Sequence, residues 1–561
     1  MRTADVTRKE FLKGAAALAG FSAFGGRPVF AAPQDWKPKK KPKLVFGVVS
    51  DTHLRTQYGG KKFYEHNGVK MDNAALKLLF QYYKRANVDA VLHCGDVTDC
   101  GLIREMEFYK QTWDEVFDGK VKPVSMIATG NHDVDCEGGA MPINLSRSLA
   151  KSFDPEVCKT VRLRFHLKES MERVWGEPYE DSWHKTVKGY HFFGFGWKNA
   201  SDTAREYHGK IYHDSPMEGK KCGLDAQKGL WMAELVRRER EAGRLDPMTP
   251  FFVANHCAMD SLDRYTKPGI IHASVAAGLG VPPGQSCNGL GFFGHGHRSL
   301  ADCKFYWFPN ACFPSVQCST LAAWKSHGGE GWCPLFAKGF GNGKVVNNDE
   351  VDHANHALLV RVYDNAVVLH RVWVSARPDP VCASLGHSFV LPLNWGAGSE
   401  AQAGKGARAM ERHPLRPENL GKTIGSPEFP PRAKLEVSLD RVDKVAAAKS
   451  SAPGQKNPAD PANPVQSESV LRIRIPKADG NPKSRMYGYN IVVAGEDGTK
   501  VRKNSYARGY CMGEGHEPNN GVTQVSIPQS ELPAGKRLSI AVRPCSALAS
   551  RGKPLTTTWR A

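Results

Sequence analysis

Five apolar runs in the first 300 residues of this 561-residue chain each lead into a histidine, an aspartate or an asparagine. The clearest covers residues 126–129 and continues into Gly130-Asn131-His132-Asp133. We interpret each run as a buried strand that ends in a tight polar turn. Helical spacing between the runs predicts an α/β sandwich with largely parallel sheets, in which side chains beyond the carboxyl ends of the strands meet. The other polar ends are Asp51-x-His53, Gly95-Asp96-x-x-Asp99-x-Gly101, His256 and Gly294-His295-x-His297.

The residue types at these five ends are those of a metal site. Asp51, His53, Asp96 and Asn131, with three further imidazoles, supply enough nitrogen and oxygen donors for two adjacent divalent ions. A carboxylate shared by both ions would lower the repulsion between them. No thiolate is among the donors, which favours Mn, Fe or Zn in a mixed nitrogen and oxygen site over structural zinc held by cysteines.

The order of these motifs resembles that of the calcineurin-like metallophosphoesterases over roughly residues 43–300, and is close to the variant in class III cyclic-nucleotide phosphodiesterases. The resemblance implies a four-layer α/β/β/α sandwich that hydrolyses a phosphomonoester or a phosphodiester with a hydroxide activated by two metal ions. It implies that His132 protonates the leaving oxygen and that Asp133 orients His132. The two ligand sets that it implies are Asp51, His53, Asp96 and His297 for one metal, and Asp96, Asn131, His256 and His295 for the other.

Two alternatives to the enzyme stay open. The chain could be a non-catalytic metal- or ligand-binding surface protein on the same scaffold, although such proteins usually lose ligands and none is missing here. It could also be a surface-attachment protein whose C-terminal region is the functional part. The related purple acid phosphatases carry a tyrosine three positions beyond the bridging aspartate and lack the first histidine. Asp99 and His53 occupy those positions, so an Fe(III)–tyrosinate site is not expected.

Substrate contacts follow less directly from the sequence. Arg55 and Arg298 come just after ligand motifs and could contact phosphate, or each could be a solvated charge. His93 is expected to be a packed histidine or one that supports a neighbouring ligand. The aromatic residues of 192–197 are expected to pack in the core. No exposed patch interleaves aromatic and basic residues, so no specific nucleic-acid recognition is predicted. The net charge of +19 suits a phosphorylated small molecule or an anionic polymer as substrate.

Residues 1–31 have the pattern of an export signal. Arg8 and Lys9 precede a short apolar run at residues 14–24, and Val29-Phe30-Ala31 offers a cleavage site. Residues 7–13 resemble a twin-arginine signal with Lys9 in place of the second arginine, so the ordinary secretory route stays open. No later segment reaches the roughly 20 apolar residues of a membrane-spanning helix. We expect a periplasmic or extracellular protein without a transmembrane anchor, with a cytoplasmic protein as the alternative.

The chain is too long for a single core, and its composition divides it. We expect a metallophosphoesterase domain at residues 43–395, which includes a β-hairpin at 357–374, and then a linker at 396–430. Short strand patterns in residues 431–561 predict an accessory β-sandwich similar to fibronectin type III. The 14 cysteines form no CxxC pair, and their connectivity is not assigned. No pattern predicts the oligomeric state.

Overall fold

The computed structural model describes most of the chain between residues 40 and 560. The export-signal region and the residues Arg55, Asp99 and Arg298 lie outside the described residues. The described ranges are 40–54, 65–66, 69–70, 74–98, 103–119, 122–134, 167–196, 204–207, 210–213, 226–257, 270–297, 299–302, 305–307, 311–321, 344–345, 355–376, 380–386, 388–393, 408–416, 419–420, 425–444, 466–478, 486–547 and 550–560.

The first sheet is built around β1 (Leu44–Val49), an uninterrupted apolar strand whose six residues are all buried. On one side β1 pairs in parallel with β4 (Ala90–Cys94), which pairs with β5 (Val124–Ala128). On the other side it pairs antiparallel with β16 (His356–Val362), the first strand of a hairpin completed by β17 (Ala366–Ser375). This hairpin confirms the one expected at residues 357–374. The antiparallel strands β18 (Val381–Ser384) and β19 (Phe389–Pro392) both pair with β17.

The second sheet has four parallel strands at its centre. They run in the order β14 (Ser315–Gln317), β12 (Gly289–Phe293), β10 (Phe251–Asn255) and β7 (Tyr190–Phe195). The antiparallel strands β6 (Ser182–Val187) and β13 (Phe305–Tyr306) lie at its two edges. Both sheets are therefore mixed, with parallel strands where the ligand motifs were expected.

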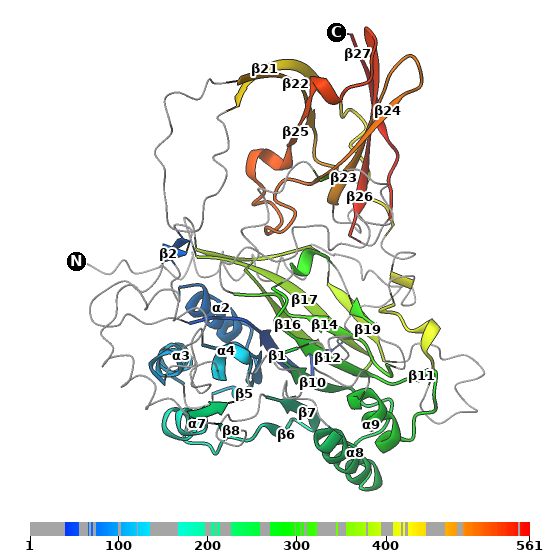
Figure 1. Cartoon of the computed structure of the whole chain (residues 1–561). Coiled ribbons are helices and arrows are strands. Elements are labelled where there is room, and N and C mark those ends of the chain that lie inside the picture. Colours follow the sequence, from blue (N-terminus) through cyan, green and yellow to red (C-terminus); the bar gives the residue numbers. More distant parts are fainter. Residues whose placement is uncertain are drawn as a thin grey trace, which may run out of the picture.

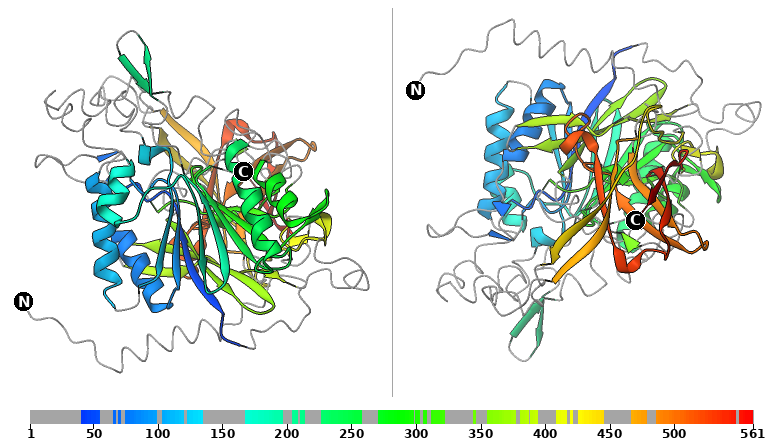
Figure 2. Two further views of the ribbon diagram at one scale, coloured as in Figure 1. Left: turned by 90° about the horizontal axis from the view of Figure 1, so that it is seen from below. Right: turned by 90° about the horizontal axis from the view of Figure 1, so that it is seen from above.

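Helices cover the outer face of each sheet (Figure 2). Helices α2 (Ala74–Arg85) and α3 (Ile103–Val116) pack on the first sheet, because Leu76, Leu79, Phe80 and Tyr83 form one buried stripe at helical spacing. Helices α8 (Ala226–Glu241) and α9 (Ile270–Leu279) pack on the second sheet. Between the sheets, Phe46 contacts Phe192 and Phe252 with ring centroids 5.1 and 4.6 Å apart. These layers confirm the expected α/β/β/α sandwich.

The C-terminal region contains two further sheets, and both are made of strands only (Figure 1). The smaller has the order β21 (Glu436–Lys444), β22 (Gln466–Ile475), β25 (Thr523–Pro528). The larger contains β24 (Lys500–Tyr506), β23 (Met486–Ala494), β26 (Arg537–Ser546) and β27 (Leu555–Arg560). At its edge β24 pairs in parallel with β15 (Lys344–Val345), a short strand from earlier in the chain.

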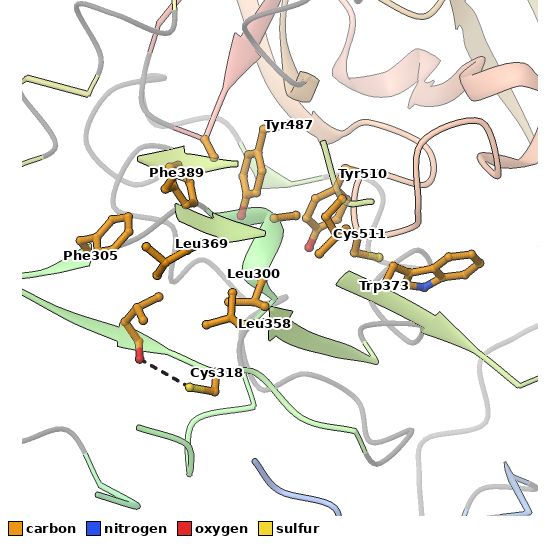
Figure 3. Packing of buried hydrophobic residues seen from close by; sticks show 14 of the residues in the cluster. Leu300, Phe305, Cys318, Leu358, Leu369, Trp373, Phe389, Tyr487, Tyr510 and Cys511 are labelled. Carbon is orange, nitrogen blue, oxygen red and sulfur yellow. Dashed lines mark hydrogen bonds between the residues drawn. The ribbon is translucent and has the colours of Figure 1, made fainter. Parts of the chain in front are cut away.

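The apolar core continues from the first sheet into the C-terminal region. Figure 3 shows Tyr487, Tyr510 and Cys511 packed over the layer that contains Leu358 and Phe389. The Nε2 of His356 in β16 donates to the carbonyl oxygen of Cys511 at 2.7 Å. The C-terminal sheets are thus packed onto the hairpin of the first sheet through an apolar interface.

The remaining elements are short or peripheral. They are β2 (Glu65–His66), β3 (Val69–Lys70), α4 (Asn131–Val134), α7 (Leu167–Trp175), β8 (Ala204–Tyr207), β9 (Lys210–His213), β11 (Gln285–Ser286), β20 (Arg408–Ala409) and the 3-10 turns η2 (Leu300–Asp302), η5 (Met410–Arg412), η6 (Pro518–Gly521) and η7 (Gln529–Glu531).

None of the helices in the described ranges is long and apolar enough to cross a membrane.

Candidate metal centre

The carboxyl ends of five parallel strands meet at one edge of the two sheets. Each motif predicted from the sequence follows one of these strands: β1, β4, β5, β10 or β12. Two groups of side chains converge there, and within each group the possible ligand atoms lie within 4.8 Å of one another. Asp96 belongs to both groups. The groups are Asp51, His53, Asp96 and His297, and Asp96, His256 and His295.

The first group is organised around the carboxylate of Asp51. Its Oδ1 lies 2.9 Å from His297 Nε2 and 3.8 Å from His53 Nε2. Its Oδ2 accepts hydrogen bonds from the Ser50 hydroxyl at 2.5 Å and from the backbone N–H of His295 at 3.1 Å. The same N–H also lies 3.1 Å from Oδ1, so the protein anchors both oxygens of Asp51. Oδ1 in addition faces two imidazole nitrogens that are 3.1 Å apart.

The second group is organised around Asp96 and Asn131. Asp96 Oδ2 lies 3.0 Å from His256 Nε2 and 3.7 Å from His53 Nε2, so a single oxygen faces both groups. Asn131 Oδ1 lies 3.1 Å from His256 Nε2 and 3.1 Å from His295 Nδ1, which adds an amide oxygen to this group. His256 Nδ1 donates to the Cys94 carbonyl at 2.9 Å, which leaves Nε2 as the nitrogen available to a metal.

The backbone at the ligands is in a conformation that residues with a side chain rarely adopt. Asp51, His53, Asp96, His295 and His297 all have φ between 39° and 65°. A residue other than glycine in this left-handed region costs on the order of 1–3 kcal/mol, and such residues cluster at functional sites. Five of them at one edge of the fold mark this place as functional, independently of the motifs.

Glycines allow the ligand loops to approach one another closely. A Cβ atom on Gly130 would lie 2.2 Å from Asp96 Oδ1. A Cβ atom on Gly294 would lie 1.9 Å from Ser50 Oγ and 2.3 Å from Asp51 Oδ2. Any side chain at either position would push a ligand carboxylate out of place, which explains why the motifs open with glycine.

Residues 44–273 match the family model of the calcineurin-like phosphoesterases. These residues form a calcineurin-like phosphoesterase domain. The matched segment contains the first three motifs and His256, and it ends before His295 and His297. The geometry adds these two residues, since both reach the same edge from the end of β12.

Comparison with whole proteins gives distant similarities. No curated protein matches the chain. Among solved structures, it is similar to vacuolar protein sorting 29 from Cryptosporidium parvum, with 10% identity and a TM-score of 0.23 over 62% of this chain and 97% of that one. It is also similar to a putative 5′-nucleotidase from Staphylococcus aureus in complex with alpha-ketoglutarate, with 10% identity and a TM-score of 0.27 over 69% of this chain. The similarity spans 60% of that nucleotidase chain.

The buried centre of the phosphoesterase domain is suited to cations. Burial opposes the charge on Asp51, but His297 and His53 outweigh it and hold the pKa of Asp51 well below its usual range. Burial also disfavours charge on His256, yet Asp96 and Asp51 raise the pKa of this histidine to about 9. Two ionised carboxylates among imidazoles form a donor set that fits divalent ions with mixed nitrogen and oxygen ligands.

His132 lies beside the ligands, at the partly exposed rim of the centre. Its ring meets the ring of His53 edge-on, with centroids 4.6 Å apart. Its backbone N–H donates to Asp96 Oδ1 at 2.8 Å, so the residue also steadies the shared carboxylate. His295 is exposed and His132 is half-buried, whereas Asp51 and His256 are fully buried. Among the described residues, the accessible side of the centre is therefore that of His132 and His295.

Asp133 joins two of the ligand loops. Its Oδ1 accepts from the backbone N–H and the hydroxyl of Thr98, both at 2.8 Å. Its Oδ2 accepts from the backbone N–H groups of Gly130 at 2.8 Å and Val97 at 3.3 Å. Burial and the charge of Asp96 raise the pKa of Asp133, while these hydrogen bonds oppose the shift. The contacts support a role in holding the Asn131 turn against the Asp96 loop, and orientation of His132 by Asp133 stays a prediction.

A sixth strand end supports the centre and was not predicted from the sequence. The loop after β14 places the Thr320 hydroxyl 2.9 Å from the carbonyl oxygen of Asp51, to which it donates. Gln317 donates to the carbonyl oxygen of Gly294 at 3.2 Å. The sequence does show a short apolar run that leads into Gln317, Ser319 and Thr320. These residue types rarely bind metals, so this strand end was not recognised as part of the centre.

The residues expected to pack rather than bind do so where the structure describes them, while Trp197 lies outside the described residues. His93 is buried, and its Nε2 lies 3.1 Å from the Thr52 hydroxyl. Burial lowers the pKa of His93 to about 3, so it is neutral under ordinary conditions. Phe192, Phe193 and Phe195 are fully buried in the second sheet. The candidates for substrate contact, Arg55 and Arg298, lie outside the described residues.

Proposed function

We propose that the chain is a metal-dependent hydrolase of a phosphomonoester or phosphodiester. One observation carries the proposal: two groups of converging ligand atoms share Asp96 in a domain that matches the calcineurin-like phosphoesterases. The complete set of ligands favours catalysis over a non-catalytic binding protein on the same scaffold.

The donors divide between two divalent ions of Mn, Fe or Zn type. Bound there, the ions would supply Lewis-acid stabilisation of phosphoryl charge and a nucleophile derived from water at neutral pH. Because Asp96 Oδ2 faces both His53 and His256, Asp96 would belong to both ligand sets in our proposal. The first ion would be held by Asp51, His53, Asp96 and His297, and the second by Asp96, Asn131, His256 and His295.

His132 acts in this proposal as the acid that protonates the leaving oxygen. Two observations support it: the ring lies against that of His53, and it is half-buried. The exposed imidazole of His295 borders the same opening. A phosphoester seated over the ligands would thus have its leaving group within reach of this rim.

We also propose that the enzyme is exported and that residues 431–561 form an accessory β-sandwich similar to fibronectin type III. The basic and apolar pattern of residues 1–31 supports export. If export occurs with cleavage after Ala31, N-terminal sequencing of protein recovered outside the cytoplasm should begin at Ala32. A mature protein that starts at residue 1 would contradict this part of the proposal.

The catalytic proposal is tested with the full-length protein loaded with Mn²⁺. Its hydrolysis of p-nitrophenyl phosphate and of bis-p-nitrophenyl phosphate should show which ester class it prefers. His132→Ala should lower kcat by about 10²–10⁴-fold, the usual contribution of a general acid, with metal content unchanged. His516→Ala, which changes an exposed histidine in the C-terminal region, is the control. Activity on neither ester at full metal occupancy would refute the catalytic proposal.

A further inference from the structure

A cavity of about 480 Å³ lies in the C-terminal region, against the three-stranded sheet β21, β22 and β25. Figure 1 shows these strands at the end of the molecule away from β1, β10 and β12, whose carboxyl ends carry the metal centre. The volume is in the range of roughly 300–1,000 Å³ that is usual for small-molecule sites. The cavity is therefore separate from the metal centre and large enough for one small ligand.

The walls of this cavity are polar and positively charged. Among its lining residues, three carry a guanidinium group and only Glu436 carries a carboxylate. Residues opposite one another on the three strands line the cavity. Arg474 of β22 lies between Glu436 of β21 and Gln524 of β25, and Arg472 lies opposite Ser438 of β21. Arg508 comes from the segment after β24. The alternating residues Leu471 and Ile473 are fully buried on the opposite face of β22, so the arginines are fixed on the cavity side.

Acidic neighbours hold two of the arginines in place without using all their donors. Arg474 Nη1 donates to Glu436 at 2.9 Å, and Arg472 Nη1 pairs with Asp440. Each guanidinium group has five N–H donors, which leaves others for a ligand. The Nε of Arg472 is buried and has no hydrogen-bond partner among the residues that the structure describes.

The charge of the surrounding region favours the same kind of ligand. Residues 431–561 contain 21 lysines and arginines and 11 aspartates and glutamates, a net charge of +10 out of +19 for the whole chain. Such a field raises the local concentration of anions. Pre-positioned arginines bind planar carboxylates and phosphates through paired hydrogen bonds.

We propose that this cavity is a binding site for a small anion, or for the anionic end of a larger molecule, that carries phosphate or carboxylate groups. Arg472, Arg474 and Arg508 supply the charge-assisted donors, and Ser438 and Gln524 supply neutral polar contacts. The site gives the C-terminal region a ligand-binding role that does not depend on phosphoester hydrolysis.

Isothermal titration calorimetry on the full-length protein tests the proposal, with pyrophosphate and citrate as the phosphate and carboxylate probes. Each titration is made with metal-loaded protein and with protein stripped by EDTA, because binding at the metal centre is lost on stripping and binding in the cavity is not. Stripped protein should bind at least one probe at a single site. The probe with the higher affinity identifies the preferred anion.

The variants Arg474→Gln and Arg472→Gln should each weaken that binding by about tenfold or more, since each removes charge-assisted hydrogen bonds. Arg474 is exposed, so its replacement should not disturb folding. Arg543→Gln removes an exposed arginine from β26, outside the cavity, and should change the affinity by less than twofold. Absence of binding to stripped wild-type protein, or equal losses in all three variants, would overturn the proposal.

Discussion

Replacing Asp133 with alanine should weaken metal binding although Asp133 is not itself a proposed ligand. The side chain is buried and joins the loop that carries Asp96 to the turn that carries Asn131. Both residues belong to the proposed ligand set of one ion, and Asp96 also faces the other. Loss of the link should therefore loosen both metal positions together.

The size of the effect follows from the donors that Asp133 satisfies. Alanine removes the acceptor of three backbone N–H groups, those of Val97, Thr98 and Gly130, in a place closed to solvent. An unsatisfied buried donor costs about 1–3 kcal/mol, and local relaxation recovers part of this cost. We expect the free energy of unfolding to fall by about 3 kcal/mol or more. Outer-shell substitutions at metal sites typically weaken metal affinity about 10–100-fold, which we expect here.

Asp89→Ala is the matched control for this prediction. Asp89 also accepts a backbone N–H, that of Val45 at 2.9 Å, but it stands at the opposite end of β1 and β4. Its loss should lower stability without changing metal affinity. Urea denaturation and Mn²⁺ titration of the full-length proteins measure the two quantities. Wild-type Mn²⁺ affinity in Asp133→Ala, or equal weakening in Asp89→Ala, would refute the reasoning.

The isosteric variant Asp133→Asn separates this role from orientation of His132. Its amide keeps one acceptor oxygen and points an N–H₂ group at backbone donors, so metal affinity should again fall, by less than in the alanine variant. If Asp133 acts only by orienting His132, the pH–rate profile should change while metal affinity stays at the wild-type value.

Three further predictions concern the same centre. In EDTA-stripped protein the raised pKa of His256 contributes stability that is fully present below pH 6.5 and is lost as the pH rises through about 9. Metal binding needs this histidine neutral, so the difference in unfolding free energy between metal-loaded and stripped protein should widen from pH 6.5 to 9. Urea titrations measure this difference, and a constant value would contradict the prediction. Stripping should lower the free energy of unfolding by about 2.7 kcal/mol per ion held at 100 times its dissociation constant, with the far-UV circular dichroism unchanged; unfolding on stripping would show that the fold depends on metal. Thr320→Val should cost about 1 kcal/mol because it removes the hydrogen bond to the Asp51 carbonyl, and an unchanged urea midpoint would show that this bond contributes little.

The positions of the ligands could be predicted from the sequence because parallel strands place their carboxyl ends at one edge. Once residues 126–129 are interpreted as a strand, Asn131 must lie at that edge, and the same holds for Asp51 after β1. The hairpin of β16 and β17 could also be predicted, since mostly apolar strand-like segments flank an Asp-Asn turn. In each case the information is local, within about ten residues.

Features that depend on distant contacts could not be predicted in this way. The strand β24 has the sequence KVRKNSY, whose charges hide a strand that is held by β23 on one side and β15 on the other. Helix α9, which was not predicted from the sequence, packs beneath the second sheet against α8. The apolar interface between the C-terminal sheets and the hairpin also joins residues more than a hundred positions apart.

The backbone strain at the ligands explains why the supporting contacts matter. Five residues with a left-handed backbone are tolerated only if surrounding interactions outweigh their conformational cost. The loops that carry the proposed ligands make such interactions on several sides. Asp51 is held by Ser50 and Thr320, the Asp96 loop by Asp133, and His256 by the Cys94 carbonyl. These contacts lie within the protein and do not require an ion. The ligands are therefore largely positioned by the fold before a metal binds, so that binding energy need not be spent on ordering the loops.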